Sequence, residues 1–246
     1  MRFIRIVFWG ALIAAVGIYM LSKNEDVNPG ESIEAPFEVV NWDDLRGFDA
    51  VELRGGYRVV YHQAAESRVE ADGPRAARDR IEAQVSGGTL RLAHRKGHQK
   101  IDEELTIHLY APTLRELSVS GAVDLRGEDV LQGEALSLDL SGAGKMALDL
   151  AVRTLSADIS GAGKYLLRGK AQQAEFSIAG AGDVRAFDLT VETLSLKVAG
   201  AGNAEVYANQ RLDVTVVGAG KVVYDGNPQE INPRMLGAGA LQKRGE

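Results

Sequence analysis

Residues 136–164 read LSLDLSGAGKMALDLAVRTLSADISGAGK, and this stretch contains most of two copies of one repeat. The triplet Gly-Ala-Gly recurs along the chain, beginning at positions 142, 161, 180, 200, 218 and 237, and a variant Gly-Ala-Val begins at position 121. The spacings from position 121 onward are 21, 19, 19, 20, 18 and 19 residues. A fixed period near twenty residues is typical of a solenoid, in which each repeat forms one coil.

Apolar and polar residues alternate in the segment before each triplet. The position two residues upstream is apolar in every copy: Val119, Leu140, Ile159, Ile178, Val198, Val216 and Met235. The position three residues upstream is polar in every copy: Ser118, Asp139, Asp158, Ser177, Lys197, Thr215 and Arg234. Alternation with period two predicts a strand with one buried face. Stacked coils would then bury an apolar ladder that no single repeat could bury.

The triplets are expected to form the corner between two strands of each coil, because glycine adopts positive φ without steric cost. The predicted corner glycines are Gly121, Gly142, Gly144, Gly161, Gly163, Gly180, Gly182, Gly200, Gly202, Gly218, Gly220, Gly237 and Gly239. The sequence therefore predicts an all-β, parallel β-helix-like solenoid whose repeats span 115–246. Within it, 225–246 is expected to be the C-terminal cap, because Pro233 indicates an edge strand.

Residues 44–114 lack the triplet but remain rich in β-forming segments, such as FDAVEL, YRVVYH, TLRLAH and LTIHLYAP. Pairs of glycines at 55–56 and 87–88 predict turns. Residues 74–85 predict one helix that begins near Pro74. We expect this region to supply the N-terminal coils of one domain covering residues 44–246.

The chain resembles the family named "putative auto-transporter adhesin, head GIN domain" over about 44–246. The resemblance is carried by FDAVELRGGYRVVYHQ, RIEAQVSGGTLRLAHRK, LYAPTLRELSVSGAVDL, the SGAGK-like repeats and the ending VVYDGNPQEINPRMLGAGAL. It implies a right-handed β-helix-like solenoid in an exported or membrane-attached protein. It brings no catalytic motif, so its implications concern fold and compartment.

Residues 1–23 (MRFIRIVFWGALIAAVGIYMLSK) predict a signal anchor or transmembrane helix. The uncharged stretch from Ile6 to Ser22 would form a helix of about 26 Å, near the lower limit for spanning a bilayer. Arg2 and Arg5 precede it, which places the N-terminus in the cytoplasm and the rest of the chain outside. Bulky residues at its end disfavour cleavage, although secretion after signal cleavage remains the alternative. Residues 24–43 predict a short tether.

Composition excludes several classes of function. The net charge of -6 and the 6% aromatic content are unlike those of nucleic-acid-binding proteins, which need clustered Lys and Arg or stacking platforms. The absence of Cys excludes disulfides, thiolate metal sites and a cysteine nucleophile. We expect no nucleic-acid partner; the oligomeric state is left open.

Three motifs suggest cofactor or metal chemistry, but each has a simpler structural interpretation. LDVTVVGAGKVV at 212–223 resembles a dinucleotide-binding turn, yet Val223 continues a strand where the fingerprint needs Gly and a helix. A calcium-binding β-roll needs carboxylates after each triplet, whereas Lys145, Lys164 and Lys221 are found there and Asp183 and Asn203 are exceptions.

His94 and His98 have the spacing of a helical metal pair, but Gly97 and the preceding strand favour an exposed loop. His62 and His108 lie in predicted strands and are expected to be ordinary exposed or partly buried residues. We therefore predict no cofactor and no metal site.

Asp139 and Asp158 share one repeat position, so they should be neighbours on adjacent coils. Two converging carboxylates would suit a carbohydrate-active enzyme acting on an envelope or extracellular polysaccharide. Because Ser118, Ser177 and other non-acidic residues share the position, a solvated polar face is favoured, and no catalytic residue is assigned. The sequence thus favours a membrane-tethered, extracytoplasmic binding or structural module with a glycan or envelope protein as ligand, and the enzyme is the alternative.

Overall fold

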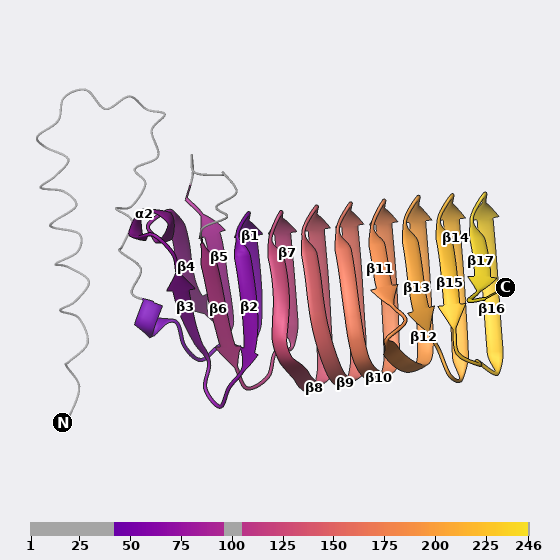
Figure 1. Ribbon diagram of the computed structural model, residues 1–246, viewed down its shortest axis with the longest axis horizontal. Coiled ribbons are helices and arrows are strands. Elements are labelled where there is room, and N and C mark those ends of the chain that lie inside the picture. The colour runs from indigo at the N-terminus through magenta and orange to yellow at the C-terminus, as the bar shows by residue number, and fades with distance from the viewer. Residues whose placement is uncertain (1–41, 96–104, 246) are drawn as a thin grey trace, which may run out of the picture. The chain divides into compact units, whose positions relative to one another are not determined.

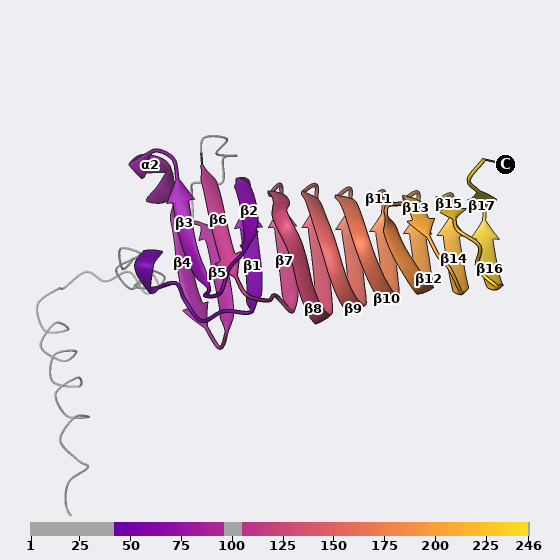
Figure 2. The ribbon, with the colours of Figure 1, turned by 60° about the horizontal axis from the view of Figure 1, so that its bottom comes forward.

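The computed structural model describes residues 42–95 and 105–245, and it is an all-β solenoid of about seven turns. Coils of equal size follow one another along the axis of the domain (Figures 1 and 2). Each coil has a side A, whose strand leads into the glycine corner, and a side B, whose strand follows it. The prediction of an all-β solenoid is confirmed.

Parallel pairing between coils builds both sides. The strands of side A are β1 (Ala50–Gly55), β5 (Thr89–His94), β7 (Glu116–Gly121), β12 (Leu189–Gly200), β14 (Arg211–Gly218) and β16 (Glu230–Gly237). The strands of side B are β2 (Arg58–Gln63), β6 (Thr106–Ala111), β11 (Asp183–Ala186), β13 (Asn203–Tyr207), β15 (Lys221–Asp225) and β17 (Ala240–Lys243). Three long strands cover both sides of a coil in one continuous run: β8 (Asp124–Gly142), β9 (Lys145–Gly161) and β10 (Lys164–Gly180).

The core is a set of apolar columns that run from coil to coil. Leu140 is paired with Ile159, and Ile159 with Ile178, at the register expected from the triplets. The same column continues through Val198 and Val216, and its members from Val119 to Val216 are buried. Burying one such side chain stabilises the fold by about 1.5–3 kcal/mol. The period-two alternation therefore defines which face of each strand enters the core.

The first glycine of each triplet closes the corner by approaching the coil before it. Gly161 has a φ of 118°, and a Cβ at this position would lie 2.7 Å from the carbonyl oxygen of Gly142. That oxygen also accepts a hydrogen bond from the amide of Ala162 at 2.9 Å. Backbone therefore contacts backbone at the corner, and a side chain has neither the room nor the required φ.

The N-terminal coils do not follow chain order. β1 pairs with β5 on one side and with β7 on the other, and β2 likewise lies between β6 and β8. The coil of β1 and β2 is thus inserted between a coil that comes later in the chain and the first triplet repeat. Two antiparallel strands, β3 (Arg68–Asp72) and β4 (Ile81–Ser86), pair with β6 and β5 beyond it.

Two expectations for this region were wrong. The helix expected over 74–85 is limited to α2 (Arg75–Arg78), because Ile81–Ser86 pairs as β4 along β5. Trp42 and Asp43, placed in the tether by sequence, belong to the short 3₁₀ helix η1 (Trp42–Asp44). Trp42 packs against the core, so ordered structure begins before residue 44.

The last described coil, β16 and β17, pairs with only one neighbouring coil within 105–245. Pro233 lies in β16, in accordance with the edge position expected for a proline that cannot donate to the ladder. None of the helices in 42–95 and 105–245 is long and apolar enough to span a membrane. The anchor predicted for residues 1–23 lies outside the described residues.

Candidate functional site: a polar face on side A

The outward residues of side A form two adjacent polar columns, which we call the serine–aspartate face. Strand register places the members of each column side by side on successive coils, at the strand spacing of about 4.8 Å. The first column is Glu116, Ser137, Ser156, Glu175, Ser195 and Asp213, and the second is Ser118, Asp139, Asp158, Ser177, Lys197 and Thr215. Because β-strands alternate, the whole face is fixed by the same register that builds the core.

Asp139 and Asp158 lie at the middle of this face and are direct register partners. Each carboxylate accepts a hydrogen bond from the serine two residues earlier: Ser137 Oγ donates to Asp139 at 3.4 Å, and Ser156 Oγ donates to Asp158 at 3.5 Å. Partial burial raises the pKa of Asp139, and the neighbouring charges of Asp158 and Glu116 raise it further. The structure thus places the predicted pair together, half-buried and hydrogen-bonded along its own strands.

A buried tyrosine fixes the backbone beneath these carboxylates. The hydroxyl of Tyr165, on side B of β10, donates towards the carbonyl oxygens of Asp158 at 2.7 Å and Leu138 at 3.0 Å. Burial raises the pKa of this hydroxyl, with smaller contributions from the charges of Asp139 and Asp158. Tyr165 therefore ties two adjacent coils together at the centre of the serine–aspartate face.

Towards the C-terminal end the face becomes a network of charged side chains around a shallow hollow of about 450 Å³. Arg211 Nε donates to Asp213 at 2.8 Å, and Asn232 Nδ2 donates to the other carboxylate oxygen of Asp213 at 2.8 Å. The Arg211 hydrogen bond, followed by that of Asn232, lowers the pKa of the Asp213 carboxyl. Outward-facing donors and acceptors of this kind suit a hydroxyl-rich or peptide-like ligand.

The other sequence motifs have structural roles. Residues 212–223 form β14, a corner and β15, with no helix after the glycines. Asp183 pairs with Lys164 at 2.9 Å and with Arg185 at 3.3 Å, so its carboxylate is already shared between two cations. Within the described residues, no group of three or more His, Asp or Glu side chains is arranged to hold a metal ion.

Of the described histidines, His94 departs from expectation, whereas His62 and His108 are partly buried on strands, within the range expected. His94 is the last residue of β5 and is half-buried, so the loop prediction was wrong for it, whereas His98 lies outside the described residues. His62 and His108 share a hydrogen bond between ring nitrogens 3.0 Å apart, and His62 also stacks on Tyr110. Sequence reasoning missed this cluster because 46 residues separate the two histidines. The alternation of YRVVYH and LTIHLYAP placed both on strands but gave no signal of their pairing.

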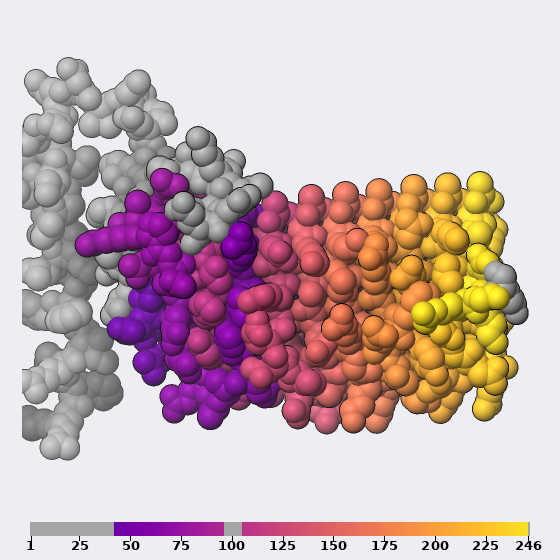
Figure 3. All heavy atoms as spheres, in the orientation of Figure 1, coloured from indigo at the N-terminus to yellow at the C-terminus, as the bar shows by residue number. Residues whose placement is uncertain are grey.

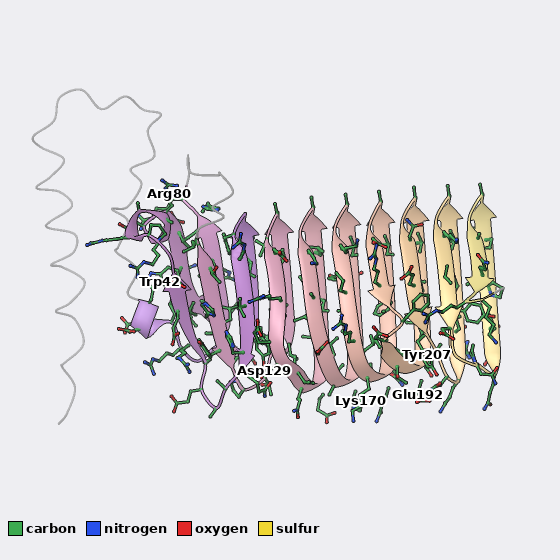
Figure 4. All side chains as sticks on the ribbon, viewed as in Figure 1. Trp42, Arg80, Asp129, Lys170, Glu192 and Tyr207 are labelled. Carbon is green, nitrogen blue, oxygen red and sulfur yellow. The ribbon has the colours of Figure 1, made fainter. Side chains whose placement is uncertain are left out.

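Side chains also project from the turn at the far end of each coil, opposite the glycine corners. Figure 4 shows Asp129, Lys170 and Glu192 along that edge. Lys170 and Glu192 line a hollow of about 440 Å³ there. The surface in Figure 3 repeats from coil to coil over β7 to β17.

Comparison with known proteins gives a family and a fold. The family model described as "Putative auto-transporter adhesin, head GIN domain" matches residues 47–228. The chain is similar to a crystal structure described as a putative adhesin from Bacteroides fragilis, with 24% identity, a TM-score of 0.75, and coverage of 80% of this chain and 92% of that one. No curated protein matches the chain.

Two further crystal structures show the same fold. One is described as a putative lipid binding protein from Parabacteroides distasonis, with 22% identity, a TM-score of 0.64, and coverage of 83% of this chain and 94% of that one. Another is described as a putative adhesin from Parabacteroides merdae, with 22% identity, a TM-score of 0.63, and coverage of 80% and 91%. At these identities the similarity establishes the solenoid and leaves the ligand to be argued from the face itself.

Proposed function

The chain belongs to the family described as "Putative auto-transporter adhesin, head GIN domain", and from this premise we propose that it is a non-catalytic binding module outside the cytoplasm. The observation that carries the proposal is the serine–aspartate face, where hydroxyl and carboxylate groups repeat at the strand spacing over successive coils. A regular row of donors and acceptors matches a ligand that is itself a repeating chain. We therefore place an envelope or extracellular glycan first among its ligands, and an envelope protein second.

A glycan array probed with soluble residues 24–246 tests this function. This shortened chain retains the whole buried core, which extends from Leu45 to Val222 among the described residues. Reproducible binding to one sugar class supports the proposal. A blank array, together with no envelope protein captured by the same shortened chain, contradicts a binding function and favours a purely structural role.

The alternative function is a carbohydrate-active enzyme, and the Asp139–Asp158 pair is what favours it. Adjacent strands place the two residues about 4.8 Å apart, near the 5–5.5 Å separation of carboxyls in retaining glycosidases. The raised pKa of Asp139 would also suit a general acid. However, the two carboxylates project in the same direction from one sheet, whereas glycosidase carboxylates flank the scissile bond. Sugar cleavage that is lost in an Asp139→Ala, Asp158→Ala variant would establish the enzyme.

For the rest of the chain, we propose that residues 1–23 anchor the module in a membrane and that residues 24–41 tether it outside. The apolar run after Arg2 and Arg5 supports this topology. We also propose a right-handed winding of the coils, the sense adopted by nearly all parallel crossovers. Recovery of an epitope-tagged chain in the soluble cytosolic fraction would contradict the anchor.

A further inference from the structure

The outward surface of side A changes its chemistry towards the C-terminus. The column directly before the triplets begins with serine and ends with large apolar residues: Ser120, Ser141, Ser160, Ala179, Ala199, Val217 and Leu236. Val217 and Leu236 are register partners and are 41% and 63% exposed, so neither belongs to the core. Because serine occupies the same position on earlier coils, the fold does not require an apolar side chain there.

The second column of the serine–aspartate face, which continues to Arg234 on β16, becomes cationic over the same coils. Lys197 is paired with Thr215, and Thr215 with Arg234. Lys197 and Arg234 are both exposed, and neither side chain takes part in an ion pair or hydrogen bond within the described residues. Earlier coils carry Asp139 and Asp158 at this position, so the solenoid forms without a cation there.

The neighbouring carboxylates do not neutralise these two cations. Asp213 accepts a hydrogen bond from Arg211, which is the largest cause of its lowered pKa, whereas the charge of Arg234 is the smallest. Glu175 lies diagonally from Lys197 in the register, but no ion pair joins their side chains. Lys197 and Arg234 therefore each present a positive charge without a bound anion.

Thr215 places a shorter side chain between the two cations. At a strand spacing of about 4.8 Å, the backbone positions of Lys197 and Arg234 lie about 9.6 Å apart. Thr215 and Arg234 line the shallow hollow of about 450 Å³. Lysine and arginine side chains are long and flexible, so both can reach an anion that lies over Thr215, whose hydroxyl can donate a third hydrogen bond.

We propose that this end of side A binds an acidic sugar residue of a polysaccharide through its carboxylate. Lys197 Nζ and the Arg234 guanidinium donate to the carboxylate from either side, and Thr215 Oγ1 donates from below. The apolar C–H face of the sugar ring packs on Val217 and Leu236. The inference rests on the proposed glycan-binding function, and it names the sugar class and the coils that hold it.

Each part of this surface disfavours a simpler ligand. A neutral sugar would leave both cations without an anion, and charge-assisted hydrogen bonds are about twice as strong as neutral ones. A small inorganic anion would leave Val217 and Leu236 in water, although exposed apolar side chains rimmed by polar residues are typical of interaction surfaces. The carboxylates of Asp139 and Asp158 repel an anionic group from the coils of β8 and β9, so they confine it to the C-terminal coils.

The test is calorimetric titration of the full chain in an uncharged detergent with a galacturonic acid trimer. The methyl-esterified trimer, which carries no charge, is the ligand control, and we expect it to bind about tenfold or more weakly than the acid. Lys197→Gln and Arg234→Gln should each weaken binding of the acid by about threefold, and the double variant by about tenfold. Lys145→Gln, which removes an exposed lysine of side B, should leave the affinity unchanged.

Leu236→Ser tests the apolar contact separately. Because serine occupies the same position on earlier coils, the variant should keep the fold. It should weaken binding of the acid by about threefold or more and leave the dependence of the affinity on salt unchanged. Lys197→Gln should instead reduce the dependence on salt, because it removes one of the two charges that salt screens.

Three results would overturn the inference: equal affinity for acid and ester, unaltered affinity in the Lys197→Gln, Arg234→Gln variant, or no binding of the acid. All the substituted side chains are exposed, so the variants should fold. If the acid fails to bind while the glycan array shows another sugar class bound, this inference fails and the glycan-binding function stands. If the array is blank as well, both fail together.

Discussion

Replacing Gly161 with alanine should destabilise the solenoid strongly, although the substitution adds only one methyl group. At a φ of 118° an L-residue pays about 1–3 kcal/mol of backbone strain. The new Cβ would also lie 2.7 Å from the carbonyl oxygen of Gly142. Moving that oxygen away weakens its hydrogen bond with Ala162, worth about 0.5–1.5 kcal/mol. Alanine recovers about 0.4–1 kcal/mol by restricting the unfolded chain, so the expected net loss is about 0.5–4 kcal/mol.

Two other glycines separate the contributions. Gly87 has a φ of 58° but no atom within 4 Å of an added Cβ, so Gly87→Ala should show the strain without a clash. This strain is about 1–2 kcal/mol, reduced by the same restriction of the unfolded chain. Gly133 lies outside the left-handed region, and its Cβ would meet only the Leu114 carbonyl oxygen at 4.0 Å. Gly133→Ala should therefore be neutral or stabilising by up to about 1 kcal/mol.

Urea unfolding of the three variants, with the m-value checked for loss of cooperativity, measures these differences. The expected order of stability is Gly133→Ala, then Gly87→Ala, then Gly161→Ala. If Gly161→Ala were as stable as Gly133→Ala, close backbone contact at the corners would not be what selects glycine there.

Three further predictions concern single side chains. Tyr165→Phe removes a buried hydroxyl that holds two adjacent coils together, and it should lower the free energy of unfolding in urea by about 1–3 kcal/mol. Tyr110→Phe removes an exposed hydrogen bond and should lower it far less. Equal losses of stability in the two variants would contradict the role of Tyr165 in holding the coils together. Asp139→Asn should stabilise the chain at pH 7, by at most about 1 kcal/mol after solvent screening, because the raised pKa means that the fold disfavours the ionised carboxylate. This gain should fade as the pH falls through the folded pKa and the wild-type carboxyl becomes protonated. Asp213→Asn should have the opposite effect, because the lowered pKa of Asp213 means that its ionised form stabilises the fold. The variant should therefore be less stable than the wild type at pH 7. This loss of stability should fade as the pH falls below about 3.8, towards the lowered pKa of the folded state. Urea midpoints at pH 7, 5 and 3 would contradict this reasoning if both variants shifted in the same direction.

The repeat made the central coils predictable from sequence. Aligning the triplets pairs Asp139 with Asp158 and Leu140 with Ile159, and the structure has these pairs. A slip of one residue would expose the apolar column, so the alternation excludes odd shifts, and the aligned triplets select one register among the rest. Sequence therefore defined both the core and the outward face over most of the solenoid.

The N-terminal coils were less predictable because their pairing is set by tertiary contacts. The alternation in FDAVEL identifies β1 as a strand, but nothing local indicates that it lies between β5 and β7. Residues 81–85 have a composition that a helix tolerates, and pairing along β5 overrides that tendency. His94 gave no signal, since its unusual environment depends on Gly55 and Tyr57, which are far away in the chain.

The most direct test of the binding function compares two matched arginine substitutions in affinity measurements with the sugar selected on the array. Ser177→Arg places a bulky cation on the serine–aspartate face, and Ala147→Arg places the same side chain on side B, at an outward position of the coil of β9. The account predicts that Ser177→Arg weakens binding by about tenfold or more and that Ala147→Arg leaves it unchanged. Equal affinity for the two variants would show that the ligand does not lie on the serine–aspartate face.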